Sequence, residues 1–244
     1  MNTLLEGILE SGKFLNSKNS AVDVHSTTSR EQCDFLQDII RDNHLKHSIE
    51  IGFAYGASTL AITEEIVKNG GKHVVIDKFQ NSAWGGNGID LLKQAGYSED
   101  VEFHEEFCYM VLPGLLKDER RFDFAYIDST KQLDWLLVDF FFLDKIMDVN
   151  GIIVFDDVTF PGIRKLLRYL CQFPNYQVHA QFPANRESGT GLKFLNKMKS
   201  LPRAESILRD EVLRTDADFG INAHAVALRK TAKDERNWDW HVSF

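Results

Sequence analysis

The stretch that most constrains the fold runs from Ile49 to Ala61 and reads IEIGFAYGASTLA. Apolar residues lead up to two glycines, Gly52 and Gly56, and a helical pattern follows them. We therefore predict a strand, a tight turn and a helix N-terminus in succession. Because glycine can turn the backbone with positive φ and approach a ligand without a Cβ, this stretch is typical of a turn that binds a nucleotide-like ligand.

Strand and helix patterns alternate along most of the chain, which is typical of a parallel sheet with right-handed crossovers. Strands are expected at 47–53, 72–78, 101–104, 122–128, 151–156 and 221–229. Helices are expected at 57–68, 89–95, 109–117, 133–147 and from Pro161 onward. The sequence thus predicts a Rossmann-like, doubly wound α/β fold, with a mainly parallel seven-stranded sheet, one antiparallel strand and helices on both faces.

A chain of 244 residues is long enough for one sizeable α/β domain with additions. We expect residues 1–44 to form an N-terminal helical cover, which includes a capping-box pattern that starts at Ser29. Residues 45–180 are expected to form the ligand-binding core, and residues 220–244 the last strand and a tail. Between them, residues 181–219 read as a helical insert or lid, with helices near 192–199 and 203–214.

The charge and the cysteines exclude several classes of protein. A net charge of −8 argues against a nucleic-acid partner, which would require a basic stripe. The longest apolar stretch is interrupted by charged residues, so no membrane span is expected. The three cysteines show no metal or disulfide spacing and the N-terminus no signal pattern, which favours a cytoplasmic protein.

Two carboxylates near the glycine turn limit the kinds of ligand that the turn can bind. The spacing Gly-x-x-x-Gly differs from the Gly-x-Gly-x-x-Gly of dinucleotide-binding turns. Glu50 lies two residues before the first glycine, where a carboxylate repels phosphate and suits an amino group. Asp77 ends the second strand, where an acid can accept hydrogen bonds from ribose hydroxyls. A nucleoside with a cationic amino-acid tail therefore fits this turn better than NAD does.

These residues resemble those of the class I S-adenosylmethionine-dependent methyltransferases, and the resemblance covers residues of about 45–175. It implies that Glu50, Gly52 and Gly56 line the methionine end of the cofactor and that Asp77 holds the ribose. Many relatives carry an acid where Phe107 stands, which leaves the adenine contacts to Glu106 or to the backbone. The predicted cofactor-binding set is Glu50, Gly52, Phe53, Ala54, Tyr55, Gly56, Ser58, Asp77, Lys78, Glu106, Phe107 and Asp128.

A second group of acids follows the fourth and fifth strands. Asp128 ends the fourth strand, and Asp156 and Asp157 end the fifth. The carboxyl ends of parallel strands meet at one edge of the sheet, where ligands bind. Three carboxylates there would repel one another unless a hard cation such as Mg²⁺ lay between them. Lys131, three residues after Asp128, can reach the same point.

This group resembles the metal-dependent O-methyltransferases of the catechol and caffeoyl-coenzyme A type. The resemblance implies that Asp128, Asp156 and Asp157 bind Mg²⁺ or another divalent cation. It also implies that Asp128 and Lys131 are catalytic, with Lys131 as the general base or as a charge that orients the acceptor hydroxyl. A metal-bound hydroxyl loses its proton more readily, and the resulting oxyanion attacks the sulfonium methyl group in line.

Other interpretations stay open at this point. The helix pattern from Pro161 and the Trp-Asp-Trp-His tail resemble natural-product and sugar methyltransferases, so the small-molecule acceptor is not identified. The alternatives are a metal-independent methyltransferase that uses Lys131 or a histidine, and a non-catalytic protein that binds S-adenosylmethionine. A homodimer is an open option. The scattered histidines are assigned structural roles; they are His25, His104, His179, His224 and His241.

Overall fold

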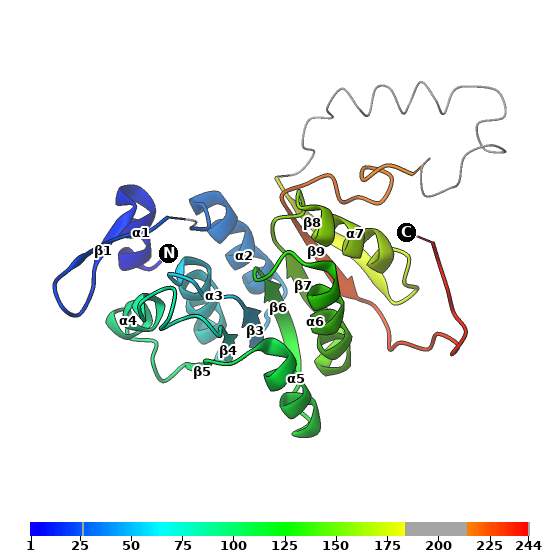
Figure 1. Cartoon of the computed structure of the whole chain (residues 1–244), viewed down its shortest axis with the longest axis horizontal. Coiled ribbons are helices and arrows are strands. Elements are labelled where there is room, and N and C mark those ends of the chain that lie inside the picture. The colour runs from blue at the N-terminus through cyan, green and yellow to red at the C-terminus, as the bar shows by residue number, and fades with distance from the viewer. Residues whose placement is uncertain (26, 184–213, 244) are drawn as a thin grey trace.

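The computed structural model describes residues 1–25, 27–183 and 214–243 and contains a seven-stranded sheet with helices on both faces (Figure 1). Its strands are β3 (His47–Ile51), β4 (Lys72–Ile76), β5 (Val101–His104), β6 (Phe122–Ile127), β7 (Met147–Phe155), β8 (Tyr176–Phe182) and β9 (Ala225–Lys230). The helices predicted near 192–199 and 203–214 lie outside the described residues, apart from the last position.

The strand order is β5-β4-β3-β6-β7-β9-β8. The first five strands in that order pair in parallel, whereas β9 runs antiparallel to both β7 and β8. This arrangement confirms the predicted Rossmann-like fold with one antiparallel strand. None of the helices in the described ranges is both long and apolar enough to span a membrane.

The helices cover both faces of the sheet. They are α1 (Thr3–Ser11), α2 (Arg30–Asp42), α3 (Ala57–Lys68), α4 (Asn87–Gln94), α5 (Cys108–Lys117), α6 (Leu133–Ile146) and α7 (Pro161–Leu170). One face packs against α5, α6 and α7, with Ile51 in that core. The other face packs against α1, α2, α3 and α4, with Tyr126 in that core. Successive residues of each strand therefore enter different cores.

Two features differ from the sequence prediction. The N-terminal cover, predicted to be helical, also contains two short strands, β1 (Lys13–Leu15) and β2 (Ala21–Asp23), which form a hairpin beside α1. The seventh strand of the sheet had no predicted position, and it is β8, which runs into the start of the predicted insert. β8 lies at the edge of the sheet and is mostly half-exposed, so its sequence lacks a strong apolar pattern.

Backbone hydrogen bonds continue the sheet by one residue beyond several strands. The amide of Asp77 donates to the carbonyl of His104 (3.1 Å), and the amide of Asp128 donates to that of Ile51 (3.0 Å). In the same way the amide of Asp156 donates to the carbonyl of Ile127 (3.1 Å). Asp77, Asp128 and Asp156 are therefore held in a row along one edge of the sheet.

Candidate active site

A cavity of about 280 Å³ opens at this edge, and it is lined by segments that follow four strands. Its lining residues are Ile51, Gly52, Phe53, Ala54, Ile76, Asp77, Lys78, Phe79, Trp84, Glu106, Phe107, Cys108, Asp128, Ser129, Thr130 and Trp135. A smaller adjoining cavity adds Thr27, Thr28, Tyr55, Gly56, Ala57 and Ser58. Eleven of the twelve residues predicted to bind the cofactor therefore line one cavity or the other; Glu50 is the exception.

The glycine turn is shaped by close contact with the segment after β6. Gly52 has a φ of +102°, and a Cβ on it would lie 2.2 Å from the carbonyl oxygen of Asp128. Gly56 has a φ of +88° and precedes the first residue of α3. The turn therefore needs glycine at these positions for its backbone conformation and, at Gly52, for space as well.

Asp77 holds the glycine turn through backbone amides. Its Oδ2 accepts hydrogen bonds from the amides of Phe53 (3.0 Å) and Ala54 (3.1 Å), and its Oδ1 accepts one from the amide of Phe79 (2.7 Å). A carboxylate has about four acceptor positions. Asp77 can therefore fix the turn and still accept one further donor from a ligand in the cavity.

The structure corrects the predicted orientation of Glu50. Its side chain is fully buried and lines neither cavity. Oε1 accepts a hydrogen bond from Ser58 Oγ (2.6 Å), and Oε2 lies 3.1 Å from His73 Nε2. Ile51 faces the cavity side of the sheet, so its strand neighbour Glu50 faces the opposite core, where it anchors the first turn of α3.

The far end of the larger cavity is aromatic. The Phe107 ring stacks on Tyr109 (centroids 5.2 Å apart, 11° between planes), and Trp135 meets it edge-on at 5.8 Å. Phe79 also meets the Phe107 ring edge-on, with the ring centroids 5.9 Å apart. Flat apolar walls of this kind fit a planar base. Glu106 lies on the rim, with its carboxylate 3.5 Å from Lys78 Nζ.

Ser129 supplies an open polar position in the same wall. Its Oγ is buried and has no hydrogen-bond partner among the described residues. Buried hydroxyl groups are nearly always paired, so this one is placed for a ligand or a water molecule. Sequence reasoning missed Ser129, although its position directly after Asp128 was a usable signal. Trp135, in contrast, reaches the cavity only because of how α6 packs.

A lysine joins the predicted carboxylates. Lys131 Nζ lies 2.7 Å from Asp128 Oδ1 and 2.9 Å from Asp157 Oδ2. Burial alone would lower the pKa of Lys131, but the two carboxylates outweigh it and raise that pKa above its ordinary value. Burial also raises the pKa of Asp128 to about 6, although Lys131 opposes this shift. Lys131 therefore keeps its proton and relieves the expected carboxylate repulsion.

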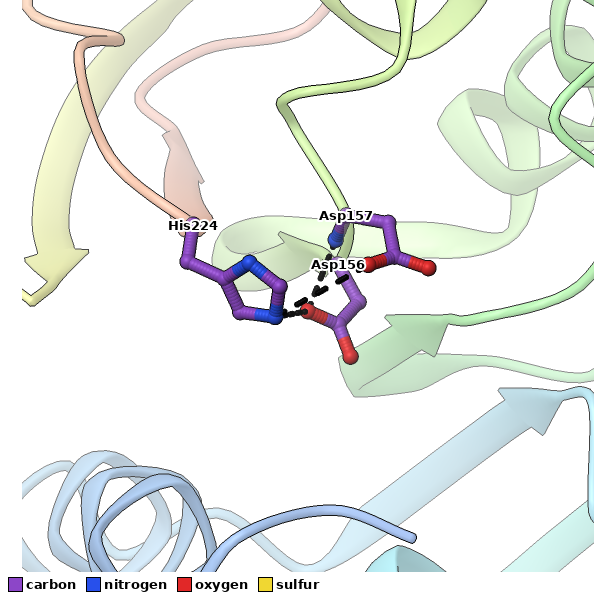
Figure 2. Close-up of side chains that lie close together, drawn as sticks. All are labelled: Asp156, Asp157 and His224. Atoms are coloured by element: carbon purple, nitrogen blue, oxygen red, sulfur yellow. Dashed lines mark hydrogen bonds and ion pairs between the residues drawn. The ribbon is translucent and has the colours of Figure 1, made fainter. Parts of the chain in front are cut away.

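The residues that cluster at the candidate cation site differ in part from the three predicted metal ligands. Within the described part of the chain, the ligand-type atoms that lie within 4.8 Å of one another belong to Asp156, Asp157 and His224 (Figure 2). Asp128 is not part of that group and connects to it through Lys131. The predicted pair Asp156 and Asp157 thus comes together with His224, and Asp128 lies outside this cluster.

Buried side chains fix Asp156. Its Oδ2 accepts a hydrogen bond from the Tyr126 hydroxyl (2.6 Å), and its Oδ1 accepts one from the amide of Asp157 (2.7 Å). Gln32 Nε2, from α2, donates to the Tyr126 hydroxyl oxygen (3.2 Å). This chain of contacts links the N-terminal cover to the acid cluster. Ligating carboxylates are commonly held by hydrogen bonds of this kind.

The sequence of the chain is similar to those of several known proteins. Residues 49–158 match the family model described as a methyltransferase domain. Caffeoyl-CoA O-methyltransferase from Medicago sativa is 28% identical over 159 residues, which cover 60% of this chain and 62% of that protein. Tricin synthase 2 from Oryza sativa subsp. japonica is 32% identical over 104 residues, which cover 41% of this chain and 35% of that protein. The chain thus spans about three-fifths of the caffeoyl-CoA enzyme that it matches.

Solved structures share the fold at lower identity. An O-methyltransferase from Bacillus cereus in complex with SAH has a TM-score of 0.60 at 20% identity and covers 73% of this chain and 83% of its own. TomG from Streptomyces achromogenes, in complex with SAM, has a TM-score of 0.55 at 21% identity and covers 63% and 73%. The fold, the matched domain and the cavity at the carboxyl edge of the sheet agree with one another. Over residues 49–158 the chain therefore matches a methyltransferase domain, and it is similar to the caffeoyl-CoA O-methyltransferases.

Proposed function

We propose that this chain transfers the methyl group of S-adenosylmethionine to an oxygen of a small hydroxylated molecule, assisted by a divalent cation. The observation that carries the proposal is the position of Asp128. This residue lines both cavities and also pairs with Lys131, which contacts Asp157. A donor bound in the cavities would therefore end beside the charged groups that can handle an acceptor hydroxyl.

The cavities match the parts of the proposed donor. Asp77 offers a free acceptor position for a ribose hydroxyl, and the walls of Phe107 and Trp135 suit the adenine ring. The methionine part would lie along the glycine turn toward Ser58 in the smaller cavity. Its amino group would lie close to Asp128, the one carboxylate that borders both cavities.

The acid cluster fits a divalent cation. Asp156 and Asp157 offer the oxygen donors that hard cations prefer, and Asp156 is already oriented by Tyr126. A bound cation would lower the pKa of an acceptor hydroxyl that coordinates it. Lys131 would remain protonated between its two carboxylates, which supports its role as an orienting charge for the acceptor oxygen over its role as a general base.

Transfer of a labelled methyl group tests the proposal directly. The full chain would be incubated with methyl-labelled S-adenosylmethionine and a panel of phenols, catechols and sugars, with Mg²⁺ or with EDTA. We expect transfer that EDTA abolishes and that Asp156→Ala abolishes as well. Transfer that persists in EDTA would favour the metal-independent alternative. Tight binding of S-adenosylmethionine without any transfer would favour the non-catalytic alternative.

A homodimer and a cytoplasmic location remain predictions from the sequence. Light scattering on the purified chain would distinguish a monomer from a dimer. If a dimer is found, repeating the measurement with S-adenosylmethionine would test whether the donor affects assembly.

A further inference from the structure

His224 is pinned beside the acid cluster by its backbone. Its amide donates to the carbonyl of Phe182 (2.8 Å), and its carbonyl accepts a hydrogen bond from the amide of Val158 (2.8 Å). It stands directly before β9, and the antiparallel course of that strand brings its first residues to the end of β7. The imidazole is therefore held next to Asp156 and Asp157 by the sheet itself (Figure 2).

The distances suit atoms that share an ion. Nε2 of His224 lies 3.5 Å from Asp156 Oδ1 and 3.7 Å from Asp157 Oδ1. Two ligands at about 2.1 Å from one metal are about 3.0 Å apart at an octahedral edge and about 3.4 Å apart at a tetrahedral edge. The observed separations are longer than those of good hydrogen bonds and near the ligand spacing. The imidazole and the two carboxylates thus lie close together, but the imidazole does not form a short hydrogen bond to either carboxylate.

The existing partners of the carboxylates leave a place for a cation. Asp156 Oδ2 is occupied by Tyr126 and Asp157 Oδ2 by Lys131, whereas the two Oδ1 atoms face His224. Asp156 Oδ1 also accepts the amide of Asp157 and keeps a second lone pair for a cation. Asp156 is only 5% exposed, so its charge requires compensation. The imidazole remains partly open to solvent, with 38% of its side chain exposed, so an ion and its water ligands can reach it.

From these observations we propose that His224 is a nitrogen ligand of the divalent cation, with Asp156 and Asp157, and that the site prefers Mn²⁺ or Co²⁺ to Mg²⁺. Mg²⁺ takes oxygen donors and dehydrates reluctantly, whereas imidazole raises the affinity for transition metals. The inference rests on the proposed function for the presence of a cation. It adds the histidine and the metal class to the proposed cation site.

Direct metal binding tests the inference. The full chain, stripped with a chelator, would be titrated with Mn²⁺ and with Mg²⁺ by calorimetry, and bound Mn²⁺ would be examined by pulsed EPR for coupling to ¹⁴N. We expect tighter binding of Mn²⁺ than of Mg²⁺ and a nitrogen signal in the wild type. His224→Ala should lose the nitrogen signal and weaken Mn²⁺ binding by more than about tenfold, while Mg²⁺ binding changes much less.

A control variant and two further substitutions of His224 make the outcome of the test clear. His47→Ala removes an exposed histidine at the opposite end of the sheet and should leave both affinities and the nitrogen signal unchanged. His224→Gln serves if the alanine variant does not fold, and His224→Asp, with an oxygen ligand, should shift the preference toward Mg²⁺. A nitrogen signal that survives in His224→Ala, or an unchanged ratio of the two affinities, overturns the inference.

The same preparations separate this inference from the proposed function. Binding of S-adenosylmethionine and methyl transfer would be measured in parallel. Methyl transfer with no detectable binding of either metal would overturn the histidine ligand and leave methyl transfer standing. Binding of Mn²⁺ through nitrogen without any methyl transfer would support the metal site and count against the proposed function.

Discussion

The two halves of the sheet edge differ in the kind of groups that they present to a ligand. The donor half, which follows β3, β4 and β5, presents backbone amides, aromatic rings and the carboxylates of Asp77 and Glu106. The oxygens of Asp77 already accept backbone amides. The acceptor half, which follows β6 and β7 and precedes β9, gathers ionisable side chains within a few ångströms. They are Asp128, Lys131, Asp156, Asp157 and His224.

This difference suggests that the donor half binds the donor and the acceptor half carries out the reaction. A rigid surface of satisfied polar groups and apolar walls can bind a large donor with little rearrangement. A cluster of charges that balance one another changes its energy when one charge is moved or removed, which suits proton and methyl transfer. Variants in the donor half should therefore change affinity and stability, whereas variants in the acceptor half should change turnover and metal binding.

The largest effect is expected at Lys131. Replacing it with methionine keeps the approximate side-chain length but removes the charge between Asp128 and Asp157, so methyl transfer should fall by about 10²–10³-fold. Binding of S-adenosylmethionine, measured by calorimetry, should change little. Lys72→Met, an exposed lysine at the opposite end of the sheet, is the control. Turnover at the wild-type rate in Lys131→Met would remove this residue from the reaction.

Gly52→Ala should damage the donor half most. The added Cβ would meet the carbonyl of Asp128 at 2.2 Å in a backbone with φ of +102°. We expect a loss on the order of 3 kcal/mol in the free energy of unfolding, together with loss of donor binding. Gly114→Ala in α5, where a Cβ meets nothing within 4 Å, should stabilise the chain slightly. Urea titration of both variants checks the difference.

A buried carboxyl behind the donor half should make stability depend on pH. Asp139 on α6 is fully buried, and burial raises its pKa to about 6, opposed by the nearby thiol of Cys108. The raised pKa means that the folded state favours the protonated form. Its cost is absent below the unfolded pKa of about 4 and complete above about pH 6, where it amounts to about 3 kcal/mol.

Asp139→Asn should remove this dependence. The variant should gain stability over the wild type as the pH rises from 4 to 7, and the gap should stay constant above that range. Asp134→Asn, an exposed acid on the same helix, should not show the gain. Unfolding curves at several pH values measure it, and a gap independent of pH would mean that Asp139 does not titrate as described.

The smallest effect is expected at Tyr126. Tyr126→Phe removes the hydroxyl that donates to Asp156 and should cost about 1–2 kcal/mol of stability. It should also weaken metal binding, because Asp156 loses an orienting contact. Tyr176→Phe removes a comparable buried bond to Asp144, far from the metal cluster in the sequence and fold. Equal metal affinities in the two variants would show that Tyr126 has only a structural role.

Local sequence was sufficient for the donor half. The alternating pattern predicts the strands and helices, and residues that directly follow a strand must lie at its carboxyl end. Gly52, Asp77 and Glu106 were therefore placed correctly beside the cavity. The direction of Glu50 was missed, because it depends on which core each face of β3 enters and on a partner, His73, from another strand.

The acceptor half needed the tertiary structure. His224 lies 67 positions after Asp157 in the sequence, and only the antiparallel pairing of β9 with β7 brings the two together. In the donor half, Trp135 likewise reaches the cavity only through the packing of α6. No local pattern reports such contacts, because their energy depends on residues that are distant in the chain.

The sequence by itself determined the order of strands and helices, the glycine turn and the row of acids along the sheet edge, since each follows from short-range periodicity and from strand direction. Tertiary structure alone decided that Lys131 bridges Asp128 and Asp157 and that His224 lies beside Asp156 and Asp157. Strand pairing and burial decide which charges can approach one another, and both depend on the whole chain.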